Sequence, residues 1–311
     1  MVYFLLIVGL VLLYAGGEFL VKSSVSLALR LKISRLVVGM TIVSMATSAP
    51  ELLVSIQSIL SGHSDICFGN IIGSNIANIG LVLAVISLIS PIAVSSQTLR
   101  VNYPMMLLAS VIFFFVLHFF NVISWQVGLS FLIILSVFMF WLVRKSKNDN
   151  QNDNLDVVSS ENDSLIKSLI YILSGAFGLY YGSGLFVDNA VIIAQDLGVS
   201  DRIISLSLVA IGTSIPELAT SIIAAFNKQN SIALGNLLGS NIFNILAVLG
   251  LSSLVADLTV FDVQLINKDL WWMLGFSLVI YPLIAINKEK KLTKTAGAIL
   301  LALYIIYIVL I

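Results

Sequence analysis

Two glutamates stand in apolar segments where a charged side chain is costly. Glu51 lies near the middle of the segment 36–60, and Glu217 holds the same place in 203–226. An ionised carboxylate inside a bilayer usually marks an ion or proton pathway. The alternative is an ion pair between helices, but no Lys, Arg or His lies in the middle of any predicted span. We therefore expect both glutamates to bind a cation.

A proline precedes each of these glutamates. Proline lacks an N–H and clashes with the carbonyl four residues back, so Pro50 and Pro216 should break their helices. Free backbone carbonyls at membrane depth are tolerated only where they are buried in protein or line a cavity. The carbonyls expected to be freed lie at Ala46 and Gly212 and near Thr47 and Thr213. Carboxylates and carbonyls make an oxygen-only site, which suits Ca²⁺ and Na⁺ better than zinc or copper.

Hydroxyl and amide side chains near the glutamates add further oxygen donors. They are Ser48, Ser214, Ser74, Ser240, Asn78 and Asn244. A lone serine in a span is more often a close-packing residue between helices. The two asparagines are stronger ligand candidates, because a buried amide requires partners.

All of these residues belong to an internal repeat. SMATSAPE at 44–51 and GNIIGSNIANI at 69–79 correspond to AIGTSIPE at 210–217 and GNLLGSNIFNI at 235–245. Glu51 is separated from Glu217 by the same sequence offset that separates Asn78 from Asn244. This self-similarity predicts a duplication.

The elements that carry these motifs are expected to be membrane spans. Apolar residues make up 59% of the 311 positions and charged residues only 10%, whereas a soluble domain carries roughly 25% charged residues. Ten spans are predicted at about 2–21, 36–60, 66–90, 101–120, 123–143, 166–186, 203–226, 231–256, 270–286 and 293–311. Five spans per copy, an odd number, would insert the second copy with inverted topology, as in many secondary transporters. The predicted fold is an all-α membrane protein with broken helices at the midplane, divided into a first repeat 1–143, a linker 144–165 and a second repeat 166–311.

Charge distribution predicts the orientation. With the N-terminus outside, nearly all of the 16 Lys and Arg residues lie on the cytoplasmic side, and only Arg202 and Lys268 lie outside. We expect both termini to be extracytoplasmic, the 144–165 loop to be cytoplasmic, and the first apolar segment to be a retained span of a cytoplasmic-membrane protein. The zero net charge indicates no nucleic-acid partner. The single cysteine, Cys67, excludes an internal disulfide or a thiolate metal cluster.

The paired motifs resemble the two α-repeats of the cation/Ca²⁺ antiporter superfamily, above all those of compact prokaryotic sodium/calcium exchangers. This resemblance implies that Glu51 and Glu217 bind Ca²⁺ together with the carbonyls of Thr47 and Thr213. It implies Na⁺ sites that use the hydroxyls of Ser48, Ser74, Ser214 and Ser240 and the carbonyls of Ser44 and Ala210, with Asn78 and Asn244 at a middle position. Potassium-dependent relatives carry Asp where this chain has Asn244, so potassium co-transport is not expected. Proton-coupled members carry an acidic residue within GNIIGS and GNLLGS, so Na⁺ is the expected driving ion.

Charge arithmetic supports exchange independently of the resemblance. Two carboxylates neutralise one Ca²⁺ or two Na⁺, whereas an empty site would bury uncompensated charge. With three Na⁺ per Ca²⁺, as the resemblance implies, one net charge crosses in each cycle. The alternatives are an H⁺-coupled or broader divalent-cation antiporter and, less expected, a cation channel. An enzyme is not expected, since the spans lack a Ser/Lys pair, an Asp pair or zinc-ligating histidines. Ca²⁺, Na⁺ and the lipid bilayer are the expected partners, with no cofactor and no obligate protein partner.

Overall fold

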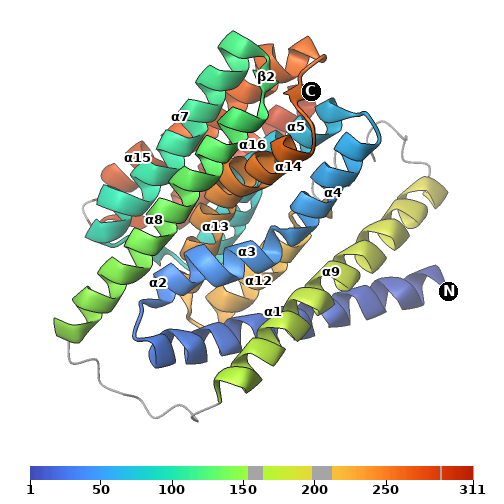
Figure 1. The fold of residues 1–311 in the computed structure, drawn as a ribbon. Helices are drawn as coiled ribbons and strands as arrows, with labels where there is room; N and C mark the ends of the chain where they lie inside the picture. The colour runs from blue at the N-terminus through green and yellow to red at the C-terminus, as the bar shows by residue number, and fades with distance from the viewer. Residues whose placement is uncertain (153–163, 198–211, 288, 311) are drawn as a thin grey trace. The chain divides into compact units, whose positions relative to one another are not determined.

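The computed structural model is almost entirely helical (Figure 1) and describes residues 1–152, 164–197, 212–287 and 289–310. Its α-helices are α1 (Val2–Leu31), α2 (Arg35–Val38), α3 (Ser44–Thr47), α4 (Ala49–Leu60), α5 (Ser64–Ala77), α6 (Ala84–Ile89), α7 (Tyr103–Phe120), α8 (Trp125–Asn152), α9 (Leu165–Asp196), α12 (Ile215–Phe226), α13 (Asn230–Phe243), α14 (Leu249–Val255), α15 (Leu270–Ala285) and α16 (Lys294–Leu310). Five π-helical segments continue or precede them: η1 (Gly39–Val43), η2 (Asn78–Leu83), η3 (Thr98–Asn102), η5 (Asn244–Val248) and η6 (Leu265–Asp269). Four two-residue strands complete the described structure: β1 (Ile92–Ala93), β2 (Val122–Ile123), β3 (Leu258–Thr259) and β4 (Lys291–Leu292).

The described residues contain seven helices long and apolar enough to cross a membrane. They are Val2–Leu31, Ser64–Ile89, Thr98–Phe120, Trp125–Asn148, Leu165–Asp196, Asn230–Val255 and Leu265–Ala285. The bent pair Arg35–Thr47 and Ala49–Leu60 makes an eighth if it is one span. The α12 and α16 helices are apolar but shorter, and part of the predicted span 203–226 lies outside the described residues. The predicted class, a helical multi-spanning membrane protein, is confirmed.

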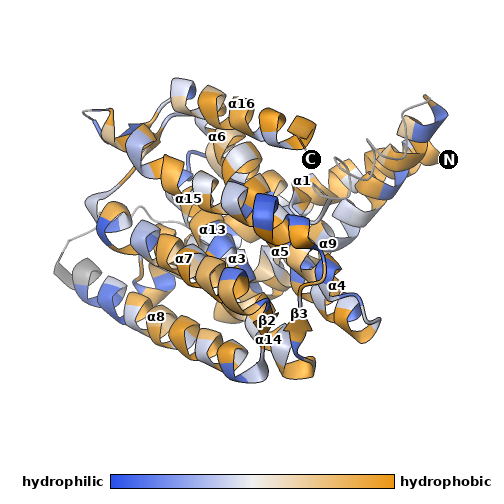
Figure 2. Ribbon diagram, turned by 90° about the horizontal axis from the view of Figure 1, so that it is seen from above, coloured by the Kyte–Doolittle hydropathy of each residue, from blue (hydrophilic) through white to orange (hydrophobic). Residues whose placement is uncertain are grey.

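Burial separates the spans into two kinds. The spans that carry the GSN motifs are the most enclosed, with 78% of the Ser64–Ile89 window and 89% of the Asn230–Val255 window buried. Helices α7, α8 and α16 expose large apolar side chains such as Phe115, Phe140 and Ile305. Figure 2 shows hydrophobic residues along most of α7, α8 and α16. An outward apolar surface of this kind is suited to lipid. The enclosed spans carry four of the predicted ligands, Ser74, Asn78, Ser240 and Asn244.

The chain forms two compact units, each built from both halves of the sequence. Unit 1 comprises Met1–Thr47 and Val137–Asn236, and unit 2 comprises Ser48–Ser136 and Leu237–Ile311. Helix α8 continues to Asn152, so the first part of the predicted linker is helical, and α9 begins at Leu165. The predicted division into two sequence repeats and a linker stays a prediction.

In unit 1, α1 packs closely against α9 through glycines (Figure 1). A Cβ atom on Gly16 would lie 2.8 Å from the carbonyl oxygen of Gly175, and one on Gly9 would lie 3.0 Å from that of Gly182. The two helices are therefore antiparallel at this crossing. Gly9 and Gly175 occupy equivalent positions of the two sequence repeats, and so do Gly16 and Gly182. At the crossing, Gly9 packs against Gly182 and Gly16 packs against Gly175, so the two contacts are equivalent as well.

Unit 2 contains further reciprocal contacts. Strand β1 pairs with β4 and β2 pairs with β3, both antiparallel. Gly128 of α8 packs against the backbone of Gly250 in α14, and Gly297 of α16 packs against the backbone of Ala84 in α6. Ala84 and Gly250 occupy equivalent positions of the two sequence repeats. A glycine of the first half therefore packs against one of these positions in the second half, and a glycine of the second half packs against the equivalent position in the first.

Candidate cation-binding site

Glu51 lies just after a break in a helix, as Pro50 predicted, and Glu217 lies in the first turn of a helix that begins at Ile215. Helix α3 ends at Thr47, and α4 begins at Ala49 after Ser48, whose φ and ψ are −84° and 4°. In the second copy Ser214 has φ and ψ of −87° and 2°, and α12 begins at the next residue. The prolines occupy the second position of the new helices, where a missing N–H removes no helical hydrogen bond. Ser48 and Ser214, which precede the two helices, therefore have nearly the same backbone conformation.

Glu51 and Glu217 both occupy the first turn of a helix and are 0% exposed. The N-terminal turn of a helix carries unsatisfied N–H groups and partial positive charge, which favours a carboxylate there. This charge offsets only part of the cost of burying an ionised group.

Within unit 1, one asparagine connects the broken helix to α12. The Thr47 hydroxyl donates to Oδ1 of Asn236 at 3.1 Å and to the Ser44 carbonyl oxygen at 3.3 Å. Nδ2 of Asn236 donates to Oγ of Ser221 at 3.2 Å, one turn beyond Glu217 on α12. The end of α3 is thus tied to the helix that carries Glu217.

A hydroxyl satisfies the carbonyl that the second proline frees. Oγ of Ser183, on α9, donates to the Gly212 carbonyl oxygen at 2.9 Å. Pro216 predicted that the Gly212 carbonyl oxygen would lose its hydrogen-bond donor within the helix. It did not predict that the Ser183 hydroxyl would replace that donor. The repeat partner of Ser183 is Gly17, which has no hydroxyl, so repeat symmetry did not indicate this bond either.

Within unit 2, α4 packs against α5 and the π segment η5. Nδ2 of Asn70 donates to the Glu51 carbonyl oxygen at 3.2 Å and to Oγ of Ser55 at 3.3 Å. Asn78 and Asn244 are both 0% exposed, and each is the first residue of a π-helical segment. Single π turns inside α-helices are frequent at functional sites because they disturb the regular carbonyl pattern.

The structure describes every predicted ligand except Ala210, which lies outside the described residues. Unit 1 holds Ser44, Thr47, Thr213, Ser214 and Glu217, and unit 2 holds Ser48, Glu51, Ser74, Asn78, Ser240 and Asn244. All are buried except Thr213, which is half-buried. No group of three or more His, Cys, Asp and Glu side chains that could hold a metal occurs in the described part of the chain. Carboxylate, hydroxyl and amide oxygens are the ligands that hard cations prefer.

Comparison with known proteins identifies the family. The family model for sodium/calcium exchanger protein matches residues 1–144 and 167–311. The chain belongs to the sodium/calcium exchanger protein family. It is therefore a membrane antiporter and not an enzyme.

Relatives and solved structures match this exchanger-family chain over nearly its full length. An uncharacterized membrane protein of Methanocaldococcus jannaschii is 38% identical over 306 residues, covering 98% of this chain and 96% of that protein. The sodium/calcium exchanger MaX1 of Methanosarcina acetivorans is 31% identical, covering 99% and 97% of the two chains. A solved structure of the sodium–calcium exchanger NCX_Mj, soaked with Na⁺ and Sr²⁺, is similar with a TM-score of 0.84 at 34% identity, covering 100% of this chain and 99% of that one.

Sequence reasoning did not single out Asn70 and Asn236, whose side chains hydrogen-bond to the predicted ligands Glu51 and Thr47 of this exchanger-family chain. Both lie in the repeated GN dipeptides, at equivalent positions of the two copies, and their partners Ser55 and Ser221 are equivalent as well. The same bond, Nδ2 to a serine Oγ, therefore forms once in each unit. A repeated polar residue with a repeated polar partner was the signal that could have found them.

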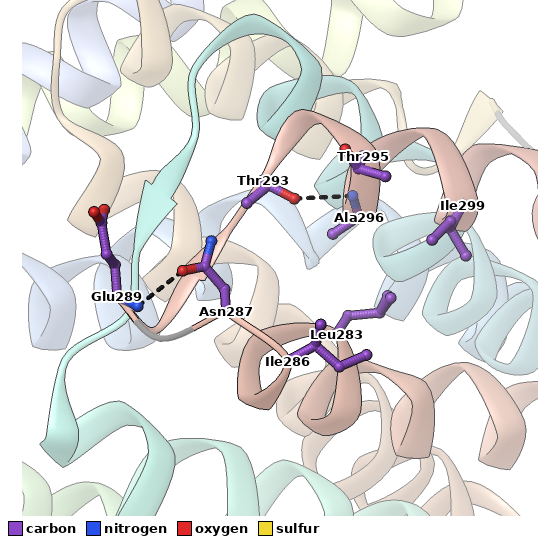
Figure 3. A pocket seen from close by; sticks show the side chains of 8 residues that line it. All are labelled: Leu283, Ile286, Asn287, Glu289, Thr293, Thr295, Ala296 and Ile299. Carbon is purple, nitrogen blue, oxygen red and sulfur yellow. Dashed lines mark hydrogen bonds between the residues drawn. The ribbon is translucent and has the colours of Figure 1, made fainter.

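The cavity in Figure 3 is not this site. It has a volume of about 660 Å³ and lies where α15 ends and α16 begins, and its lining includes none of the predicted ligands. Oδ1 of Asn287 accepts from the Glu289 N–H at 2.8 Å, and Oγ1 of Thr293 accepts from the Ala296 N–H at 3.2 Å. Glu289 is also paired with Lys291 at 2.6 Å, and that hydrogen bond lowers the pKa of the exposed carboxyl. These polar groups form a turn and a helix cap, which leaves little of the lining to recognise a ligand.

Proposed function

We propose that this protein exchanges Na⁺ for Ca²⁺ across the cytoplasmic membrane by alternating access. One observation carries the proposal: a fully buried glutamate lies in the first turn of a helix that has a proline at its second position, and the same arrangement recurs in the second copy of the repeat. A chain of the sodium/calcium exchanger protein family with two such carboxylates has the charge to neutralise one Ca²⁺. Family membership and the similarity to NCX_Mj support this choice of ions.

The proposed ligands follow the repeat. Glu51 and Glu217 bind Ca²⁺ with the carbonyl oxygens of Thr47 and Thr213. Na⁺ is bound by the remaining oxygens, which belong to Ser44, Ser48, Ser74, Ser214, Ser240 and Ala210, with Asn78 and Asn244 at the middle position. The burial of all described members except Thr213 supports this assignment, because buried oxygens without water gain most from a cation.

We further propose ten membrane helices in two inverted repeats of five, with both termini extracytoplasmic. The antiparallel, reciprocal glycine crossing of α1 and α9 supports this arrangement. A two-fold axis that places Gly9 on Gly175 and Gly16 on Gly182 also reverses the direction of the helix. Two repeats with inverted topology in the membrane are related by such an axis. The reciprocal pairing of β1 with β4 and β2 with β3 supports the same symmetry.

Charge explains why exchange is obligatory in this proposal. An empty site would carry the negative charge of two carboxylates through a low-dielectric interior, which is strongly unfavourable. A site loaded with Ca²⁺ or Na⁺ is close to neutral and can change its access. Three Na⁺ per Ca²⁺ make the cycle electrogenic, and the uncharged amide of Asn244 makes it independent of K⁺.

The test is Ca²⁺ uptake into proteoliposomes preloaded with Na⁺ and diluted into Na⁺-free medium. We expect uptake to require internal Na⁺, to be indifferent to K⁺, and to be lost in Glu51→Gln and Glu217→Gln. Glu289→Gln is the matched control, since this glutamate is exposed at a turn, and it should leave uptake unchanged.

Other outcomes would replace the proposal. Uptake driven equally by a pH gradient would indicate an H⁺-coupled antiporter. Uptake that needs no counter-ion would indicate a channel. Full uptake by both glutamine variants would remove the glutamates from the site.

A further inference from the structure

Four buried asparagines of unit 2 form two repeat-related pairs. Asn75 corresponds to Asn241 and Asn78 to Asn244, each at the offset that relates the two copies of the repeat. All four are at most 1% exposed. If the two halves were in the same conformation, every hydrogen bond in this group would occur twice.

The structure contains only one of the two equivalent bonds among its described residues. Nδ2 of Asn244 donates to Oδ1 of Asn75 at 3.1 Å. The equivalent bond would run from Nδ2 of Asn78 to Oδ1 of Asn241. Both of these atoms are buried, and neither has a hydrogen-bond partner in the described part of the chain.

The donors of Asn75 and Asn241 also differ. Nδ2 of Asn75 reaches across to the carbonyl oxygen of Asn241 at 3.4 Å. Nδ2 of Asn241 instead turns back within its own helix, to the Leu237 carbonyl oxygen at 2.8 Å. The same motif thus holds one asparagine turned toward the other half and one turned away.

This difference has a consequence for the proposed cation site. With its Nδ2 held by Asn75, the amide of Asn244 has a fixed orientation, and its buried Oδ1 has no protein partner among the described residues. An oxygen held in this way is pre-organised to bind a cation. The amide of Asn78 has no such anchor within the same described ranges.

We infer that Asn75 and Asn241 are positioning residues that alternately anchor Asn244 and Asn78. In an inverted-repeat transporter, each half adopts the conformation of the other when access changes sides. The bond from Asn244 to Asn75 is then replaced by the bond from Asn78 to Asn241. This inference rests on the proposed exchange function. It adds that Asn75 and Asn241 couple the middle ligands, Asn78 and Asn244, to the side of the membrane on which the site is open.

The test compares Asn75→Ala with Asn241→Ala by the sidedness of Ca²⁺ binding. The half-saturating Ca²⁺ concentration is measured at one face in right-side-out membrane vesicles and at the other face in inside-out vesicles. Asn75→Ala removes the acceptor for Asn244 in the described state, and Asn241→Ala removes the acceptor for Asn78 in the opposite state. The apparent affinity at each face falls with the fraction of protein open to it.

We expect the ratio of the two half-saturating concentrations to shift by roughly threefold to tenfold, in opposite directions for the two variants, as the loss of one buried hydrogen bond allows. The double variant should return the ratio toward that of the wild type. Asn102→Ala is the matched control, because Asn102 is equally buried in unit 2 but outside the group, and its ratio should be unchanged. If an alanine variant fails to insert, Asn75→Ser and Asn241→Ser provide the same comparison.

A failure of the proposed function and a failure of this inference would give different results. Wild-type vesicles without Na⁺-driven Ca²⁺ uptake would overturn the proposed function. Normal wild-type exchange with both variants shifted in the same direction, or with neither shifted, would overturn this inference alone.

Discussion

At the scale of single residues, amide side chains organise the backbone around the two glutamates. A helix break inside a membrane exposes backbone groups that water cannot satisfy. Asn70 donates to the carbonyl of Glu51 itself, and Asn236 accepts from the hydroxyl of Thr47 at the end of α3. Ser183 satisfies the carbonyl of Gly212. The geometry of the carboxylates thus depends on neutral residues that need not touch an ion.

Asn236→Ala should weaken cation binding without removing it. The change eliminates the acceptor of Thr47 and the donor to Ser221, two buried hydrogen bonds worth about 0.5–1.5 kcal/mol each. We expect the half-saturating Ca²⁺ concentration to rise about tenfold or somewhat more, measured by Ca²⁺ uptake into Na⁺-loaded proteoliposomes. Asn189→Ala is the control, since its Nδ2 bonds only within α9 in the described structure, to the Leu185 carbonyl oxygen. Equal effects of the two substitutions would show that Asn236 has no special role in positioning the site.

At the scale of elements, small residues decide how the helices approach one another. In lipid no hydrophobic force drives helices together, so close packing through glycine is a main source of association. The crossing of α1 and α9 uses glycines from both helices, with backbone against backbone. The antiparallel direction of this crossing supports the proposed inverted repeat.

Gly175→Ala should destabilise unit 1. Its Cβ would lie 2.7 Å from the Gly16 carbonyl oxygen and 2.9 Å from the Leu20 N, so the two backbones would have to separate. Overpacking of this kind costs about 1–3 kcal/mol, and we expect a lower melting temperature in detergent. Gly184→Ala, on the same helix, is the control, because outside the adjacent backbone of α9 no described atom lies within 4 Å of its Cβ position. A melting temperature of Gly175→Ala equal to that of Gly184→Ala would contradict the close crossing.

At the scale of the whole molecule, the property that matters is the charge moved in one cycle. Nearly all Lys and Arg residues fall in the predicted loops and span ends, so the site carboxylates are the main charges inside the spans. The number of carboxylates limits how many cations the protein can carry while its binding site stays close to neutral. The third Na⁺ of the proposed cycle is the charge that remains uncompensated.

An imposed membrane potential should change the rate of Ca²⁺ uptake. Three Na⁺ leaving for one Ca²⁺ entering carry one net positive charge out of the vesicle, so an interior-positive potential should accelerate uptake. One charge across 100 mV corresponds to about 2.3 kcal/mol. The potential is set with valinomycin and a K⁺ gradient, and uptake is followed in Na⁺-loaded proteoliposomes. Ca²⁺/Ca²⁺ exchange moves no net charge and should not respond; an equal lack of response in Na⁺/Ca²⁺ exchange would indicate two Na⁺ per Ca²⁺.

The sequence by itself determined the features that depend on a few neighbouring residues. Hydropathy located the apolar segments, Pro50 located the helix break at Ser48, and Pro216 located the start of α12, because the steric clash of proline acts within one helical turn. The repeated glutamates predicted the chemistry, since an ionised carboxylate in an apolar segment requires a compensating positive charge. The constant offset between the two sets of motifs revealed the duplication, because a repeat is visible in the order of the residues alone.

Only the tertiary structure decided which polar groups meet. The bonds from Ser183 to Gly212 and from Thr47 to Asn236 join segments that sequence spacing does not relate. Asn75 and Asn241 occupy equivalent places in nearly identical motifs, yet one turns toward the other half and one turns away. Such similar local sequences do not decide which of two different hydrogen bonds forms, because the choice depends on how distant helices pack.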